Sequence, residues 1–123
     1  MFKRFTAAVF LVVLTSCASL IAETPAQRVF AAKQDYKALL TVANEYADLP
    51  RCDDPLTTVV LCSDFDVIER MQKVDRYVEV TLDEAEDIVR TPGLTDDALS
   101  LAIRSAESAV EVFRVVLTEE GLL

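Results

Sequence analysis

Apolar residues recur every three or four positions in three stretches of this chain, which is the spacing of one face of an α-helix. The stretches cover residues 24–47, 63–90 and 95–118. The second stripe is wide enough to contact two neighbours, and in the third stripe small alanines permit close approach of a partner helix. The expected core positions are Val29, Ala32, Tyr36, Leu39, Ala43, Tyr46, Val67, Ile68, Met71, Val74, Val78, Leu82, Ala85, Ile88, Val89, Leu99, Ala102, Ile103, Ala106, Ala109, Val110, Phe113, Val116 and Leu117.

Residues that favour helix starts and stops flank each stretch. Thr24 is suited to cap the first helix, and Gln27 is placed to complete a capping box with it. Ser63 and Thr95 are the expected caps of the second and third helices. The Thr-Pro-Gly sequence at 91–93 predicts the end of the second helix.

The lengths of the two connections predict the topology. A short turn makes the second and third helices antiparallel neighbours, while the long connection over 48–62 lets the first helix lie alongside them. We therefore predict an all-α fold, an antiparallel three-helix bundle running up, down and up, with 48–62 at the end opposite the turn at 92–94. The β-branched run at 57–61 is interpreted as an ordered loop, because no second strand is available to pair with it.

The N-terminal region has the pattern of an export signal. Lys3 and Arg4 precede an apolar run at residues 7–14, and Leu-Thr-Ser-Cys follows at 14–17. These four residues resemble the lipobox of bacterial lipoproteins, in which the cysteine receives diacylglycerol and becomes the first residue of the mature protein. The resemblance implies cleavage before Cys17, acyl chains such as palmitate on that residue and, because alanine follows it, sorting to the outer membrane.

Other fates of this segment remain open. An ordinary signal peptidase could cut after Ala18, because small residues stand at the required offsets. Residues 5–22 could also stay as an uncleaved anchor, although their polar residues make a mediocre span, or pack as a buried helix. The favoured organisation is a lipoprotein signal peptide over 1–16, a tether over 17–23 and a three-helix domain over 24–123.

Two cysteines, Cys52 and Cys62, remain once Cys17 is modified. In an oxidising compartment such a pair predicts a disulfide, for which chain entropy gives roughly 3 kcal/mol of stabilisation. A redox pair more often has two intervening residues, and a metal site needs further ligands. A structural disulfide is therefore favoured over both alternatives.

The composition argues against several kinds of chemistry. The chain has 21 acidic and 12 basic residues, a net charge of −9, and removal of Lys3 and Arg4 with the leader makes it −11. Such a charge repels phosphates, so we expect no nucleic-acid partner. The sequence has no histidine, and its two glycines, Gly93 and Gly121, are too far apart for a phosphate-binding loop. We expect no catalytic residue, no metal site and no cofactor.

Carboxylates crowd the second helix, several of them four residues apart, where like charges repel. We interpret them as a solvated face whose repulsion is offset by Arg90, by a basic residue of another helix or by a divalent cation. Paired carboxylates of this kind also occur in glycosidases, but a hydrolase of the cell wall needs a cleft that a small bundle does not offer. The residues are Glu79, Asp83, Glu84, Glu86 and Asp87.

Two expectations concern single residues near the core. Asp75 interrupts the apolar stripe of the second helix, so it should face water or pair with a cation, for which the candidates are Arg28, Lys33 and Arg104. The larger apolar residues Phe30, Tyr36, Tyr46, Met71 and Phe113 are expected to fill the core rather than to form a ligand site.

Together with the lipobox, two further stretches resemble small uncharacterised lipoproteins of proteobacteria and their prophages. These stretches are Thr24–Lys33 and the segments around Cys52 and Cys62. The resemblance covers most of the chain, but its motifs are structural, and the group has no assigned activity. It implies an envelope location, and it offers no catalytic residue that could be carried over to this chain.

The sequence thus predicts a non-enzymatic interaction or structural module, held at the periplasmic face of the envelope by the lipid on Cys17. Its partner would be an envelope protein. Two alternatives stay open: a periplasmic carrier of a small apolar ligand between the helices, and an accessory protein associated with the cell wall or with lysis.

Overall fold

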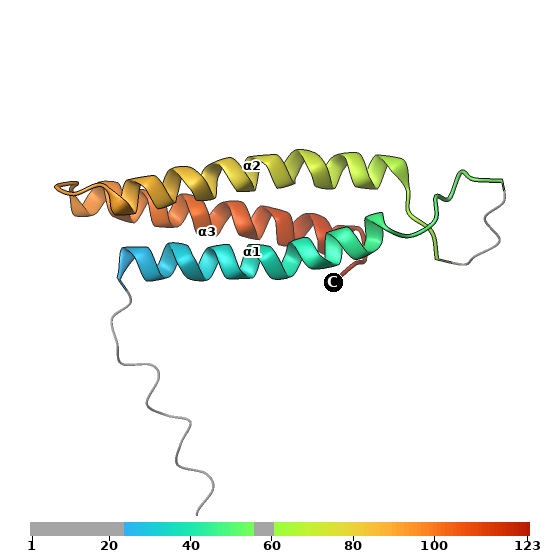
Figure 1. Cartoon of the computed structure of the whole chain (residues 1–123), viewed down its shortest axis with the longest axis horizontal. Coiled ribbons are helices and arrows are strands. Elements are labelled where there is room, and N and C mark those ends of the chain that lie inside the picture. Colours follow the sequence, from blue (N-terminus) through green and yellow to red (C-terminus); the bar gives the residue numbers. More distant parts are fainter. Residues whose placement is uncertain (1–23, 56–60) are drawn as a thin grey trace, which may run out of the picture.

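Three helices make up most of the described chain. The computed structural model describes residues 24–55 and 61–123, in which α1 covers Pro25–Ala47, α2 covers Phe65–Arg90 and α3 covers Asp96–Glu119. The helices run up, down and up, and each packs against both others (Figure 1). The predicted antiparallel three-helix bundle is confirmed, and the described residues contain no strand.

The two ends of the bundle carry different features. At one end, α1 begins beside the tight turn that joins α2 to α3 (Figure 1). At the other end lie the long connection between α1 and α2 and the end of α3, as the sequence predicted. The tight turn contains Gly93 with φ of 81°, a left-handed conformation that glycine adopts without steric cost.

Side-chain caps define the starts of α1 and α3. The Thr24 hydroxyl accepts a hydrogen bond from the N–H of Gln27 at 3.2 Å, and the Gln27 side chain accepts one from the N–H of Thr24 at 2.7 Å. The Thr95 hydroxyl accepts a bond from the N–H of Ala98 at 3.3 Å. Each cap satisfies a helix N–H group that has no partner within the helix and is typically worth about 1 kcal/mol. Both predicted caps are confirmed.

Large side chains from all three helices meet in the core around small residues of α3. Phe113, Leu82 and Val29 are fully buried, one from each helix. Ala106 is also fully buried, and its small side chain lets the helices approach closely. The ring of Tyr36 lies 5.9 Å from that of Phe113. Burial of each large apolar side chain contributes about 1.5–3 kcal/mol, so the core supplies much of the stability of the bundle.

Two sequence predictions about side chains are wrong. Phe30 is 64% exposed rather than buried, because it follows buried Val29 and one helical step turns it toward solvent. Ser63 is not the cap of α2: the cap is Asp64, whose carboxylate accepts a bond from the N–H of Asp66 at 2.8 Å. Ser63 is buried one residue earlier, where it serves the connection between α1 and α2.

Candidate functional site

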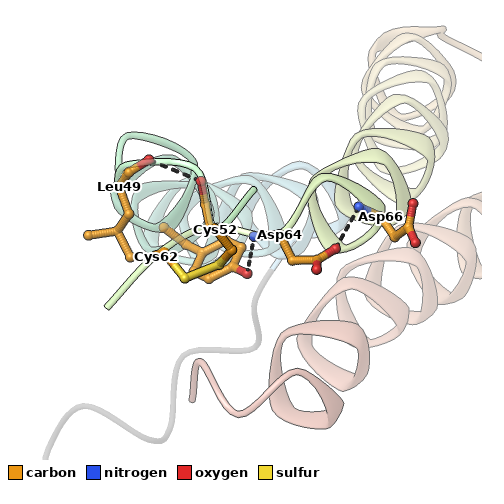
Figure 2. Close-up of a disulfide and its surroundings, with 7 residues drawn as sticks. Leu49, Cys52, Cys62, Asp64 and Asp66 are labelled. Carbon is orange, nitrogen blue, oxygen red and sulfur yellow. Dashed lines mark hydrogen bonds between the residues drawn. A yellow bond between two sulfur atoms is a disulfide. The ribbon is translucent and has the colours of Figure 1, made fainter. Parts of the chain in front are cut away.

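A disulfide closes the connection between α1 and α2. Cys52 and Cys62 are bonded, with their Cα atoms 4.9 Å apart, and the predicted pairing is confirmed (Figure 2). The bond lies in the connection between the end of α1 and the start of α2. This connection is at the end of the bundle away from the start of α1 (Figure 1). It therefore ties the two arms of the connection to each other rather than one helix to another.

Hydrogen bonds also join the two arms of the connection, independently of the disulfide. The N–H of Ser63 donates to the carbonyl of Pro50 at 2.8 Å, and the N–H of Cys52 donates to the carbonyl of Ser63 at 3.1 Å. The Ser63 hydroxyl donates to the carbonyl of Leu49 at 3.0 Å (Figure 2). These bonds satisfy a fully buried serine and fix where the chain enters α2.

Two further contacts link the start of α2 to the chain that leaves α1. The N–H of Asp64 donates to the hydroxyl of Tyr46 at 2.8 Å. The guanidinium of Arg51 lies 5.4 Å from the ring centroid of Phe65, a distance at which cation and ring attract. The surroundings of the disulfide are thus those of a structural clamp between α1 and α2.

The predicted lipidation residue, Cys17, lies outside the described residues. The same holds for the signal peptide and tether predicted over 1–16 and 17–23, and for residues 57–60 of the β-branched run. In the part of the chain that the structure describes, no helix is long and apolar enough to cross a membrane. Lipidation stays a prediction from the N-terminal motif.

Lys33 of α1 offsets part of the carboxylate crowding on α2. Its ammonium group donates to Asp83 at 3.1 Å and also to Glu86, which pairs with Arg90 as well. The hydrogen bond to Glu86 is the main cause that raises the pKa of Lys33, and the same bond lowers the pKa of Glu86. Two of the expected counter-charges are thus present, a basic residue of another helix and Arg90. Across residues 24–55 and 61–123, no group of three or more histidine, cysteine or acidic residues is arranged to hold a metal ion.

Asp75 pairs with a tyrosine rather than with a cation. The Tyr36 hydroxyl donates a hydrogen bond to its carboxylate. Burial, and then this bond, raise the pKa of Tyr36 well above its usual value. Of the two expectations for Asp75, a position facing water or a pairing with a cation, the pairing with a cation is wrong, because Tyr36 lies at the core edge and reaches the carboxylate directly. The three candidate cations, Arg28, Lys33 and Arg104, bond instead to Glu107, to the α2 carboxylates and to Ser100.

A second line of apolar side chains runs along the sides of α2 and α3 that face away from α1. Tyr77 and Val80 of α2 are 54% and 57% exposed, and Leu101 of α3 is 60% exposed. Single exposed apolar residues are normal, but a set aligned along two adjacent helices is typical of an interaction surface. We call this surface the outer face; its exposed apolar residues are Tyr77, Val80, Leu94, Leu101, Val112 and Val115.

A shallow groove between α2 and α3 adjoins the outer face. Its volume is about 390 Å³, and Leu94 and Leu101 form part of its rim. Thr81 and Ser105 are the lining residues farthest from the α2–α3 turn on their helices, which indicates that the middle of α2 and the middle of α3 lie at similar heights. The outer face is therefore bordered by a concave region in addition to its exposed apolar residues.

Sequence reasoning missed the outer face, although a signal for it was present. The exposed positions of α2 are spaced alternately three and four residues apart, as the core positions are. Because charged residues occupy much of that second series, the pattern indicated only a solvated surface. The exposed aromatic ring of Tyr77 in its middle was the residue that set it apart.

Comparison of the chain with protein-family models, with curated proteins and with solved structures finds no match. What the outer face and the clamp do is therefore argued from their geometry.

Proposed function

We propose that this protein is a lipid-anchored, non-enzymatic interaction module of the bacterial envelope, and that it binds through the outer face. The observation that carries the proposal is the alignment of exposed Tyr77, Val80 and Leu101 on helices whose inner faces are already buried in the core. Tyrosine is enriched in protein interfaces, because its ring buries a large area at a low cost in side-chain entropy.

The N-terminal motif supports the anchoring half of the proposal. Cys17 lies seven residues before Thr24, so a fully extended tether would keep the start of α1 within roughly 25 Å of the membrane. Two or more acyl chains on one cysteine hold a protein firmly, whereas one chain is marginal. We place the module at the periplasmic face of the outer membrane, with an envelope protein as its partner.

The pairing of charged groups supports a binding role over acid–base catalysis. Asp83 and Glu86 are engaged by Lys33, and Asp75 is engaged by Tyr36. A general acid or base must exchange a proton with a substrate, which these partnered groups are poorly placed to do. The outer face, in contrast, is exposed along both helices.

The anchoring half is tested by feeding labelled palmitate to cells that express the wild type or Cys17→Ser. We expect label on the wild type and none on the variant. The double variant Cys52→Ser/Cys62→Ser is the control, and it should be labelled like the wild type. Equal labelling of Cys17→Ser would contradict lipidation at this residue.

The binding half is tested by placing a photo-crosslinking amino acid at Tyr77 or Leu101 in living cells. Gln34, an exposed residue of α1, is the matched control position. Crosslinked products are expected from the first two positions and not from the third. No product from Tyr77 and Leu101, or equal product from all three, would reject the outer face as the binding surface.

A further inference from the structure

The charged residues on the outer side of α2 are arranged so that this side is complementary to the same side of a second copy running in the opposite direction. Its exposed stripe starts with basic residues near the disulfide end, has Tyr77 and Val80 in the middle, and ends with acidic residues near the tight turn. The spacing alternates between three and four residues, as in the contact stripe of paired helices. In order along α2, the stripe is Arg70, Lys73, Tyr77, Val80, Glu84 and Asp87.

An antiparallel second copy would match this stripe position by position. With the two-fold axis passing midway between Tyr77 and Val80, the tyrosine of one copy lies opposite the valine of the other. Lys73 then lies opposite Glu84 of the second copy, and Arg70 opposite its Asp87. A parallel arrangement would instead place each charge opposite its like. Closed two-fold contacts require this kind of self-complementary surface.

The outer side of α3 has the same property. Its stripe has two small serines in the middle and apolar residues on both sides. In order along α3, the stripe is Ala98, Leu101, Ser105, Ser108, Val112 and Val115. Reversal places Leu101 opposite Val112 of the second copy and the two serines opposite each other. No charged residue occurs in this stripe between Ala98 and Val115.

One two-fold axis serves both helices. The midpoint between Tyr77 and Val80 and the midpoint between Ser105 and Ser108 are nearly the same number of residues from the turn that joins α2 to α3. Thr81 and Ser105, which lie close to these midpoints, both line the end of the groove away from the turn, which supports this placement. Bulky residues at the centre of α2 thus lie beside small residues at the centre of α3.

The size and charge of this surface suit a dimer. Two adjacent helices of 26 and 24 residues, each about 10 Å wide, offer roughly 700–800 Å² per copy, close to the ~800 Å² per partner of standard interfaces. Although the whole chain is strongly acidic, opposite charges nearly balance in the two stripes. Arg70 and Lys73 now pair with Glu120 and Glu69, but both cations are more than half exposed, and ion pairs of surface cations are weak.

We propose that the partner of the outer face is a second copy of this chain, packed antiparallel, α2 on α2 and α3 on α3. This inference rests on the proposed function, since it names the partner of the same surface. It places the two N-terminal tethers at opposite ends of the dimer. Both tethers reach one membrane only when the helices lie along that membrane.

Charge reversal tests the dimer and its direction. The mature lipoprotein, purified from membranes in detergent, is examined by sedimentation equilibrium at low salt as wild type, Lys73→Glu, Glu84→Lys and the double variant. Each single variant places two like-charged pairs in the interface and should weaken dimerisation by about tenfold. The double variant restores both pairs and should dimerise like the wild type. Gln34→Glu, on α1, adds a charge outside the interface and should leave dimerisation unchanged.

Each result decides the proposal. Circular dichroism and thermal melting of the same samples show whether a variant has lost its fold. The double variant contains both substitutions of the single variants, so restored dimerisation would show that the single variants fail only because of their like charges. A monomeric wild type, or single variants that dimerise normally, would overturn the dimer. A double variant that stays weak would overturn the antiparallel register. If photo-crosslinks from Tyr77 and Leu101 join a different protein while the wild type is monomeric, the binding role stands and self-association fails.

Discussion

The hydroxyl of Ser63 donates a hydrogen bond to the carbonyl oxygen of Leu49, 3.0 Å away, and so joins the two arms of the connection between α1 and α2. Ser63 is fully buried, so its removal would leave a polar group of the clamp without this partner. A residue whose type suggested a helix cap thus has its main role in tertiary structure.

Replacement of this serine should destabilise the domain. Ser63→Ala is expected to lower the free energy of unfolding by about 1–2 kcal/mol, measured by urea denaturation, because the Leu49 carbonyl loses its donor. Gln34→Ala, at an exposed site of α1, should change stability by less than about 0.5 kcal/mol. Similar losses in both variants would show that the buried bond has no special importance.

Loss of the disulfide should lower the stability of the bundle without unfolding it. Cys52→Ser/Cys62→Ser is expected to lose about 3 kcal/mol, because the unfolded chain gains the entropy of an open loop. The helical signal in far-UV circular dichroism should remain, since the Ser63 bonds and the core are intact. A double variant without helical signal at 25 °C would contradict this division of roles.

Two phenylalanines provide a matched test of the core. Phe113→Ala should cost about 3–5 kcal/mol, because the side chain is fully buried and its removal leaves a cavity. Phe30→Ala should cost less than about 1 kcal/mol, since that ring is mostly exposed. Urea denaturation of both variants gives the comparison, and equal losses would place Phe30 in the core after all.

The Tyr36–Asp75 pair predicts a loss of stability in alkali. The raised pKa means that folded Tyr36 keeps its proton above pH 10, where the tyrosine of the unfolded chain releases it. Its contribution is therefore complete below about pH 10 and declines as the pH rises further. The free energy of unfolding, measured between pH 8 and 11, should fall less steeply in Tyr36→Phe than in the wild type.

Phe30→Leu is the control for this effect, because Phe30 is exposed and has no titratable group. Its pH profile should follow that of the wild type. Lys33 contributes in the same direction in every variant, since its pKa is also raised. Parallel profiles for Tyr36→Phe and the wild type would show that the Tyr36 hydroxyl does not titrate differently on folding.

The helices and most of their ends were predictable, because the information is local. Thr24 and Thr95 lie next to the residues that they cap, and the Thr-Pro-Gly turn stops α2 by its own backbone preferences. The disulfide followed from the cysteine count. The prediction of Ser63 as the cap of α2 was wrong, because serine and aspartate are both suited to that position and only the packing of the connection decides between Ser63 and Asp64.

The contacts between helices were less predictable, because they depend on rotation and relative height. Lys33 meets Asp83 and Glu86 fifty or more residues away, and the register of α1 on α2 is set by the clamp, which no local pattern describes. Phe30 illustrates the dependence on rotation. It lies next to the apolar stripe of α1, and the rotation of the helix about its axis decides whether such a residue is buried or exposed. The outer face was missed for a related reason, since periodicity marks a stripe without telling whether this domain covers it.

The position of α1 beside the α2–α3 turn also determines how the domain would bear mechanical load. The start of α1 and the end of α3 lie at opposite ends of the bundle, and these two helices run in the same direction (Figure 1). A pull between those points acts along the helix axes and stretches the whole seam between α1 and α3 at once. The domain should therefore resist in shear, where many contacts must slide together, rather than peel open one turn at a time.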